Sequence, residues 1–541
     1  MPVRYLFITG GVVSSLGKGI LTASLGLLLQ RRGLRVVPLK FDPYLNVDPG
    51  TMNPYQHGEV FVTEDGAETD LDLGHYERFL HQDMHRENNV TAGQVYYELI
   101  LKERAGRFLG KTVQVVPHLT REIQERIRRL ARENVDVVIV EVGGTVGDIE
   151  SLPFLEAIRQ FHLDIGKENA LFVHLTLVPY LGTAEELKTK PTQHSVMKLR
   201  EIGIQPDFIL CRSEKHLPKA VREKIALFTN VPVDHVFEIP YVGTIYEVPL
   251  VLHKQGVDQV IARLWHLPGT PQLDDWRDLV KRIKHPRQEV TVALAGKYVH
   301  MKDTYKSVYE AITHAAAHLR LRVHLRRVDT QRVEREGAEA YLRDVDAVLV
   351  PGGFGKRGVE GMIQVARYAR EHGLPYLGLC LGMQVAVIEF ARHVVGWVDA
   401  HSTEFDPQTS HPVIVLLPEQ KGVRQIGGTL RLGAYTARVT PGSLLHQIYG
   451  SLQITERHRH RYEFNPEVRK PLEEAGLRVA AESTEGHLVE AIEIPGHPFF
   501  VAVQYHPEFR SRPLNPHPLF VGFLRAALEH HERRYPLLAD A

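Results

Sequence analysis

The sequence predicts an α/β protein with two doubly wound domains, the first built on a P-loop-like parallel sheet. Short, continuously apolar runs alternate with longer helical stretches in both halves of the 541-residue chain, which is typical of parallel strands covered on both faces by helices. A stretch rich in proline and charge separates the halves. A glycine-rich turn follows the first apolar run, as in phosphate-binding sheets.

The apolar, β-branched runs are the predicted strands. In the first half they span residues 5–9, 36–41, 113–116, 137–142, 171–177, 208–211 and 236–239. In the second half they span residues 290–295, 345–350, 376–379, 412–417, 477–481, 489–494 and 499–504, and those after Ser402 are less often separated by helices. We therefore predict a first domain at residues 1–266, a linker at 267–289 and a second domain at 290–541.

Composition excludes several classes of protein. Lys+Arg and Asp+Glu both number 65, so the zero net charge gives no field that would attract a nucleic acid. No apolar run approaches the roughly 18 residues of a membrane span, and no secretory signal precedes the first strand. The only two cysteines, Cys211 and Cys380, are too few for a disulfide framework. We expect a cytoplasmic protein without membrane or nucleic-acid partners.

The run Gly378-Leu379-Cys380-Leu381-Gly382 follows an apolar stretch and predicts a nucleophile elbow, a sharp strand-to-helix turn that presents one reactive side chain. A thiol needs a base near neutral pH, because the ordinary pKa of cysteine is about 8.5. His506 can supply that base, and Glu508 can orient it. The sequence thus predicts a triad of these three residues.

Two further expectations follow from the elbow. Backbone N–H groups of Leu381 and of the glycine-rich turn around Gly353 are the predicted donors to an oxyanion. Cys211, which has no such flanking glycines, is predicted to be a core residue.

The turn Gly10–Gly19 follows the first strand and opens a helical run. Its glycines allow backbone N–H groups to converge on phosphate oxygens, and Lys18 adds a charge at the start of the helix. The spacing is not that of the standard P-loop, because one extra residue separates Gly11 from Gly17. Gly19 also stands where a serine or threonine normally binds magnesium, so carboxylates must take that role.

Asp72 and Glu141 are the candidate magnesium ligands, and each could equally be a solvated acidic residue on this reasoning alone. Glu141 ends a predicted strand, where open α/β sheets place their ligands. Lys188–Gln193 is basic and rich in hydroxyl groups, and Lys40 ends the second strand. Both could face phosphates, although a surface position explains either of them as well.

Taken together, Ile8–Gly19 with its unusual loop length, Gly58–Gly66, Lys188–Gln193 and Arg457–Glu463 closely resemble the CTP synthase family. The resemblance covers essentially the whole chain. It implies a ligase that forms a C–N bond by ATP-dependent amination of UTP at C4, through a 4-phosphorylated UTP, with ammonia released from glutamine and transferred between sites. It also implies that the second half is a class I glutamine amidotransferase domain.

The resemblance further implies the residues of each site. The implied triad is Cys380, His506 and Glu508, and the implied Mg²⁺ ligands are Asp72 and Glu141. ATP would contact Ser15, Leu16, Gly17, Lys18, Gly19, Ile20, Lys40, Asp72 and Val242. UTP, and the product CTP as an inhibitor, would contact Ser14, Asp148, Ile149, Glu150, Lys188, Thr189, Lys190, Pro191, Thr192, Gln193 and Lys224. Glutamine would contact Gly353, Leu381, Gly382, Met383, Gln384, Glu404 and Arg461. A homotetramer and activation by GTP are implied as well.

Three alternatives are weighed against this hypothesis. Another amidoligase with a glutaminase domain would act on a carboxylate, and only the resemblance decides against it. A nucleotide sensor or assembly subunit without activity would not need Cys380, His506, Glu508 and Lys18 together. A nucleic-acid-binding protein would depend on the basic stretches 121–132 and 457–461, of which the first has the charge pattern of a solvated helix face.

Overall fold

The computed structural model describes residues 2–417, 420 and 427–536, so the outer ends of the two predicted domains, residues 1 and 541, lie outside the described residues. The chain divides into two compact units, one of residues 1–49 and 72–280 and the other of residues 50–71 and 281–541. Segment 50–71 therefore packs with the second unit, although it lies between two parts of the first unit along the chain.

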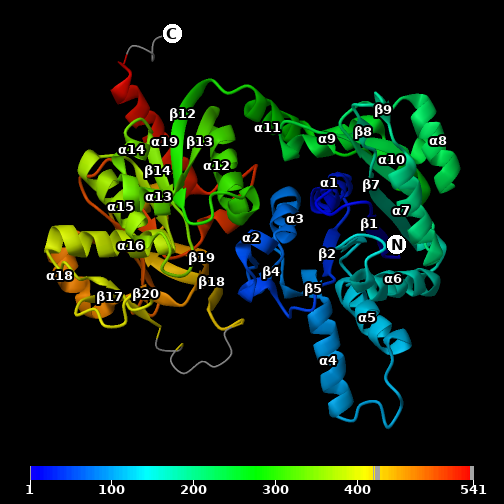
Figure 1. The fold of residues 1–541 in the computed structure, drawn as a ribbon, viewed down its shortest axis with the longest axis horizontal. Helices are drawn as coiled ribbons and strands as arrows, with labels where there is room; N and C mark the ends of the chain where they lie inside the picture. Colours follow the sequence, from blue (N-terminus) through cyan, green and yellow to red (C-terminus); the bar gives the residue numbers. More distant parts are fainter. Residues whose placement is uncertain (1, 418–419, 421–426, 537–541) are drawn as a thin grey trace. The chain divides into compact units, whose positions relative to one another are not determined.

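The first unit contains a seven-stranded parallel sheet in the order β11-β10-β7-β1-β6-β2-β5 (Figure 1). Its strands are β1 (Arg4–Gly10), β2 (Val36–Asp42), β5 (Asn89–Thr91), β6 (Val137–Val142), β7 (Ala170–Leu177), β10 (Phe208–Ser213) and β11 (Val236–Pro240). Every residue of β6 is buried, which explains why the strand is a nearly continuous apolar run. The fold class is confirmed.

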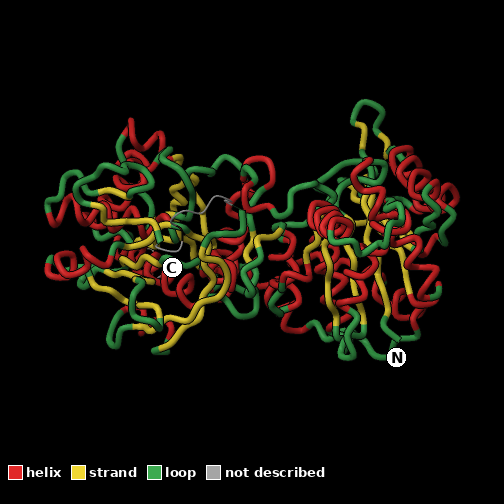
Figure 2. The backbone as a smooth tube through the Cα atoms, turned by 90° about the horizontal axis from the view of Figure 1, so that it is seen from below, coloured by secondary structure: helices red, strands yellow, loops and turns green. Residues whose placement is uncertain are grey.

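Helices lie on both sides of this sheet (Figure 2). They are α1 (Lys18–Gln30), α3 (Asp72–Leu80), α4 (Ala92–Arg104), α5 (Thr120–Leu130), α6 (Leu152–Ile165), α7 (Lys190–Glu201), α8 (Lys219–Thr229), α9 (Val248–Gln255), α10 (Val257–Trp265) and α11 (Asp274–Lys284). Helix α11 occupies much of the stretch 267–289, and Trp276 Nε1 donates to the carbonyl of Tyr246 at 2.7 Å. Cys211 is fully buried, as predicted.

One predicted strand of the first half is wrong. Residues 113–116 form no strand, and the last two of them begin a short π-helical turn, Val115–Leu119. Val115 and Val116 are each 46% exposed, so their β-branched side chains do not mark a buried strand here.

The second unit contains a nine-stranded sheet in the order β13-β12-β14-β15-β23-β22-β21-β18-β19. Its strands are β12 (Gln288–Gly296), β13 (Leu321–Asp329), β14 (Ala347–Val350), β15 (Tyr376–Leu379), β18 (Arg431–Val439), β19 (Gln453–His460), β21 (Arg478–Ser483), β22 (Val489–Glu493) and β23 (Phe500–Val503). Strands β13, β12, β14, β15 and β23 are neighbours in this order and run parallel. The remaining neighbouring pairs are antiparallel. Strands β13, β18 and β19 were not predicted, and the two edge strands among them, β13 and β19, are rich in charged residues and histidine.

The helices of this unit pack on both faces of the sheet. They include α12 (Lys306–Leu319), α13 (Thr330–Glu336), α14 (Glu339–Leu342), α15 (Val359–His372), α16 (Leu381–Phe390), α17 (Leu444–Tyr449), α18 (Arg469–Glu474) and α19 (Pro518–Arg534). A small sheet joins β16 (His401–Ser402), β17 (Pro412–Leu416) and β20 (Tyr462–Phe464). Segment 50–71 adds α2 (Pro54–His57), β3 (Phe61–Val62) and β4 (Glu68–Thr69). Among the described residues, no helix is long and apolar enough to cross a membrane.

Candidate active sites

Cys380 sits between β15 and α16 with φ 52° and ψ −101°, a backbone conformation that a non-glycine residue keeps only when its surroundings enforce it. Both flanking glycines are needed because the backbone of the turn packs directly against neighbouring backbone atoms. A Cβ on Gly378 would lie 2.7 Å from the carbonyl oxygen of Gly382, and a Cβ on Gly382 would lie 2.1 Å from that of Val350. The turn has the geometry of a nucleophile elbow.

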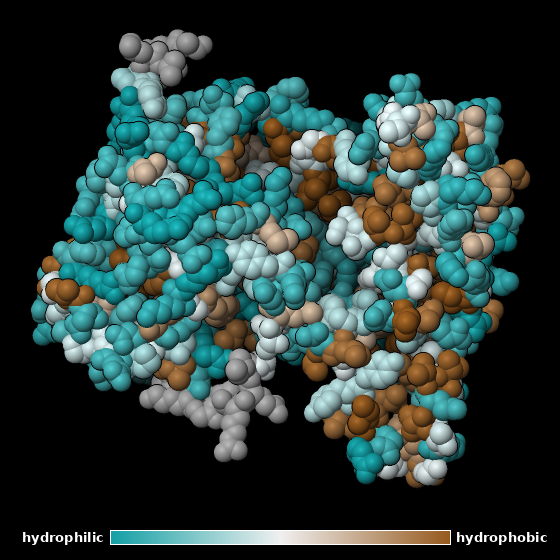
Figure 3. All heavy atoms as spheres, in the orientation of Figure 1, coloured by the Kyte–Doolittle hydropathy of each residue, from teal (hydrophilic) through white to brown (hydrophobic). Residues whose placement is uncertain are grey.

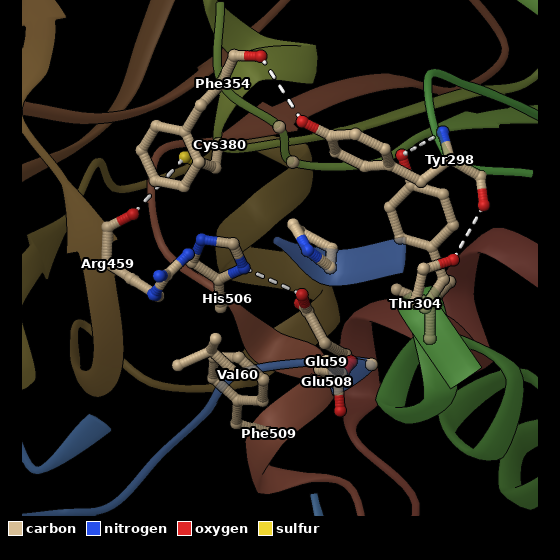
Figure 4. Close-up of a pocket in the computed structure, with 16 residues that line it drawn as sticks. Glu59, Val60, Tyr298, Thr304, Phe354, Cys380, Arg459, His506, Glu508 and Phe509 are labelled. Carbon is tan, nitrogen blue, oxygen red and sulfur yellow. Dashed lines mark hydrogen bonds and ion pairs between the residues drawn. The ribbon is translucent and has the colours of Figure 1, made fainter. Parts of the chain in front are cut away.

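His506 is oriented on three sides. Its Nδ1 lies 2.7 Å from Oε1 of Glu508, and its backbone N–H donates to the carbonyl of Arg457 at 2.8 Å. Its ring stacks on Phe509 with centroids 5.2 Å apart. Nε2, on the other side of the ring, is buried and makes no hydrogen bond of standard geometry to any described residue. This nitrogen belongs to the same pocket as Cys380 (Figure 4).

The charges around His506 favour the protonated form of its ring. Burial alone would lower the pKa of the imidazole, but the negative charges of Glu508 and of the Cys380 thiolate raise that pKa to about 10. An imidazolium beside a cysteine is one of the arrangements that favour a thiolate. An activated thiolate with an oriented base is the arrangement required for nucleophilic attack on an amide.

The pocket around this triad draws side chains from both parts of the second unit (Figure 4). Its lining consists of Pro54, Gly58, Glu59, Val60, Tyr298, Thr304, Tyr305, Val308, Gly352, Gly353, Phe354, Cys380, Arg459, His506, Glu508 and Phe509. The first four belong to segment 50–71. Glu59 anchors that segment, since its carboxylate accepts from the backbone N–H of Ser307 at 3.0 Å and from the hydroxyl at 2.5 Å.

Five of the seven predicted glutamine contacts lie in the pocket or beside Cys380, and the other two, Glu404 and Arg461, hydrogen-bond to other described residues. Gly353 lines the pocket, and Leu381, Gly382, Met383 and Gln384 form the buried first turn of α16 beside Cys380. Glu404 accepts from the N–H of Gly355 at 2.9 Å, and burial raises the pKa of this carboxyl. Arg461 donates to Gln420 at 2.7 Å and to Thr429 at 3.1 Å.

Lys297, which was not predicted as a site residue, is 1% exposed. Its ammonium donates to the carbonyls of Phe354, at 3.2 Å, and Gly355, so it braces the turn that carries Gly353. Burial lowers the pKa of Lys297 to about 8. The one feature of the sequence that could have indicated Lys297 is its position directly after the carboxyl end of β12, where such sheets place their ligands. The pocket residues of segment 50–71 had no signal apart from the resemblance of Gly58–Gly66.

In the first unit, the glycine-rich turn joins β1 to α1, which begins at Lys18. A Cβ on Gly11 would lie 1.5 Å from Oγ of Ser195, so only glycine allows the backbone to pass there. Lys18 Nζ donates to the carbonyl of Gly144 at 2.6 Å, and burial lowers the pKa of this lysine. The turn can present N–H groups and one ammonium to phosphate oxygens.

The missing hydroxyl of the phosphate loop has a structural explanation. A Cβ on Gly19 would lie 1.9 Å from Oδ1 of Asp72, so this carboxylate occupies the space of a serine or threonine side chain. Asp72 and Glu141 both bind the ammonium of Lys40, Glu141 at 2.9 Å. Tyr76 donates to Glu141 at 2.5 Å, and burial raises the pKa of Glu141.

This donor set fits a magnesium ion that a nucleotide brings with it. Among the described residues, no three His, Cys, Asp or Glu side chains are grouped to hold a metal alone. One or two carboxylates are typical of a Mg²⁺ site in which phosphate oxygens and water complete the coordination.

Most of the remaining nucleotide candidates lie beyond the carboxyl ends of the parallel strands, where such sheets bind ligands. Ser14 and Ser15 follow β1, and Asp148, Ile149 and Glu150 follow β6; all five are exposed. Lys188–Gln193 comes after β7 along the chain and runs into α7, which begins at Lys190, and Gln193 donates to the Thr189 hydroxyl at 2.9 Å. Lys224 is exposed on α8, and Val242 is half-buried after β11.

These features define a glutamine amidotransferase joined to a nucleotide-binding α/β unit. Residues 300–526 match the family model described as glutamine amidotransferase class-I, and residues 4–267 match the model described as CTP synthase N-terminus. The CTP synthase of Syntrophus aciditrophicus is 57% identical over 535 residues, which cover 99% of both chains. A CTP synthase of Thermus thermophilus is 58% identical over 540 residues, 98% of both chains. The chain belongs to the CTP synthase family.

A solved structure of the glutaminase domain of a Trypanosoma brucei CTPS with bound acivicin is also similar to this chain. It is 39% identical and covers 44% of this chain and 94% of its own, with a TM-score of 0.42.

Proposed function

We propose that this protein converts UTP to CTP, using ATP to activate the uracil ring and glutamine as the nitrogen donor. The observation that carries the proposal is the presence, in one chain of the CTP synthase family, of an oriented Cys380–His506–Glu508 triad and a phosphate loop backed by Lys18. We assign the synthetase to residues 1–266 and the amidotransferase to residues 290–541, joined by 267–289. The family-model boundaries support this division.

At the glutaminase site, His506 takes the proton of Cys380, and the thiolate attacks the amide carbon of glutamine. Backbone N–H groups of Leu381 and of the Gly353 turn stabilise the oxyanion. His506 returns the proton to the leaving ammonia, and water then releases glutamate from the thioester. Gly353, Leu381, Gly382, Met383, Gln384, Glu404 and Arg461 bind the substrate in this proposal.

At the synthetase site, the oxygen at C4 of uracil is a poor leaving group until the γ-phosphoryl of ATP is transferred to it. Lys18 and Lys40 neutralise phosphate charge and align ATP, and ammonia then displaces phosphate from C4. Magnesium held by Asp72 and Glu141 would supply further charge neutralisation. Ser15–Ile20 and Val242 complete the proposed ATP site. Ser14, Asp148–Glu150, Lys188–Gln193 and Lys224 form the proposed UTP site.

Regulation and location belong to the same proposal. CTP differs from UTP only around C4, so the product competes for the contacts to ribose and triphosphate and inhibits. GTP is proposed as the activator on the ground of family membership. A cytoplasmic location is proposed because both cysteines are free thiols, as in a reducing compartment.

We also propose a homotetramer. Exposed apolar side chains gather on α4 and on the chain that follows it (Figure 3): Tyr97, Ile100, Leu101, Leu109, Val115 and Val116, each at least 46% exposed. A patch of this kind supports contact with a second copy of the chain.

The test compares Cys380→Ala and Lys18→Ala with UTP, ATP and either glutamine or an ammonium salt. Cys380→Ala should lose the glutamine-driven reaction and keep the ammonia-driven one, while Lys18→Ala should lose both. Cys211→Ala and Lys254→Ala, a buried thiol and an exposed lysine outside the proposed sites, serve as controls. Equal loss of both reactions in Cys380→Ala would contradict the proposed division of labour.

A further inference from the structure

A buried amide touches the sulfur of the proposed nucleophile. Gln504 is fully buried, and its Nε2 lies 3.6 Å from Sγ of Cys380, within hydrogen-bonding distance for sulfur. The parallel pairing of β15 with β23 explains this proximity, because Cys380 and Gln504 directly follow the carboxyl ends of these strands. The N–H of Cys380 donates to the carbonyl of Val503 at 2.7 Å and fixes the register.

The orientation of the Gln504 amide follows from its other neighbour. Nε2 of Gln384 donates to the carbonyl of Tyr462 at 2.9 Å and to Oε1 of Gln504 at 3.4 Å. Since a backbone carbonyl can only accept, the NH₂ group of Gln384 must face Tyr462. Its second hydrogen then requires an oxygen from Gln504, so the NH₂ group of Gln504 is turned toward the sulfur.

We propose that Gln504 is a further catalytic residue of the glutaminase reaction, which donates an N–H hydrogen bond to the thiolate of Cys380 and holds the sulfur in line for attack. The proposal rests on the proposed function. The carbonyl of Arg459 lies 3.9 Å from the same sulfur and can accept from the protonated thiol. The sulfur thus has an acceptor for its neutral form and a donor for its anionic form.

Gln504 transfers no proton in this scheme. The proton of Cys380 passes to Nε2 of His506 and later to the leaving ammonia, while the sulfur lone pair forms the bond to the amide carbon. A hydrogen bond to an ionised acceptor is roughly twice as strong as a neutral one, so the amide favours the thiolate over the thiol. The Tyr462 carbonyl therefore fixes the amide of Gln384, which fixes the amide of Gln504 against the nucleophile.

The test measures the rate at which iodoacetamide alkylates Cys380 as a function of pH, in the full chain without ligands and on a Cys211→Ala background. Gln504→Met removes the donor at similar volume, and Gln504→Glu replaces it with a group that repels the thiolate. We expect the pH midpoint of alkylation to rise by about one unit in Gln504→Met, which is about tenfold slower reaction at pH values below the midpoint. The rise should be larger in Gln504→Glu.

Two further readouts separate this role from a structural one. The kcat of glutamine-driven CTP formation should fall about 10- to 100-fold with little change in KM, while ammonia-driven formation stays at the wild-type rate and shows that the chain is folded. Gln384→Met should also shift the alkylation midpoint upward, because it releases the Gln504 amide. Unchanged alkylation profiles in Gln504→Met and Gln504→Glu, with glutamine hydrolysis intact in the parent chain, would overturn the inference and leave the proposed function standing. A parent chain that hydrolyses no glutamine would overturn both.

Discussion

Arg457 donates through Nε to the carboxylate of Glu64 at 2.9 Å, although 393 positions separate the two residues in the chain. Arg457 is fully buried, and its NH1 group also donates to the carbonyl of Val62 at 3.0 Å. Its own carbonyl accepts the N–H of His506. One residue of β19 therefore contacts both segment 50–71 and the base of the triad.

This contact predicts that Arg457→Lys impairs the glutaminase while it keeps the charge. Lysine lacks the planar fork that bonds Glu64 and Val62 together, so segment 50–71, whose residues line the pocket of His506, should lose an anchor. We expect glutamine hydrolysis to fall about tenfold, whereas the ammonia-driven reaction should change less. The measurement is glutamate release against ammonia-driven CTP formation.

A double-mutant cycle with Glu64→Gln checks whether the pair is coupled. Residues in one hydrogen-bonded network show coupling energies of about 0.5–3 kcal/mol, and we expect a value within that range for unfolding of the second unit. Additive effects of the two substitutions would show that the contact contributes nothing measurable.

Gly19→Ser should abolish CTP formation from either nitrogen source, by about 100-fold or more. The new Cβ would lie 1.9 Å from Oδ1 of Asp72 and would displace that carboxylate from the phosphate loop. Glutamine hydrolysis without nucleotides should remain. Gly182→Ser is the matched control, because a Cβ there meets no atom within 4 Å. Full activity of Gly19→Ser would refute the role of Asp72.

Gly382→Ala should destabilise the elbow. A Cβ at this position would lie 2.1 Å from the carbonyl oxygen of Val350, and overpacking of a buried site costs typically about 1–3 kcal/mol. We expect loss of glutamine-driven activity and a lower melting temperature of the second unit by calorimetry. Gly450→Ala, at an open position with φ 66°, tests backbone strain without the clash and should retain the activity.

The ion pair between His506 and Glu508 predicts that the stability of the fold depends on pH. The pKa of His506 in the folded protein, about 10, lies above its ordinary value of 6.5. The pair therefore stabilises the fold fully below pH 6.5, and this contribution is lost as the pH rises through 10. Glu508→Gln should lower the melting temperature by several degrees near pH 6 and by much less near pH 10. An equal deficit at both pH values would argue against the charged pair.

The exposed apolar side chains of α4 predict a change in assembly. Ile100→Asp combined with Leu109→Asp places charge where residues are 55% and 89% exposed, so the isolated fold should tolerate both substitutions. We expect light scattering to report a smaller assembly than for the parent chain. An unchanged mass would remove the patch from the proposed interface, and Leu227→Asp, 79% exposed on α8, serves as the control.

Local chemistry made the elbow and the phosphate loop predictable. Gly378 and Gly382 bracket Cys380 because a backbone turn this tight leaves no space for a Cβ, and this constraint acts on adjacent residues. The buried parallel strands were predictable for a similar reason, since burial on both faces demands continuous apolar runs. The edge strands β13 and β19 escaped detection because they carry charged and histidine side chains.

Contacts between distant residues decided the rest. No local pattern indicates that Asp72 fills the space above Gly19, that segment 50–71 lines the pocket of Cys380, or that Gln504 reaches the sulfur. Residues 113–116 show the reverse case, in which a β-branched run finds no strand to pair with. Backbone sterics and periodicity act over a few residues and can be read along the chain. Pairing of strands and packing of buried polar groups depend on partners hundreds of positions away, so they exist only once the chain has folded.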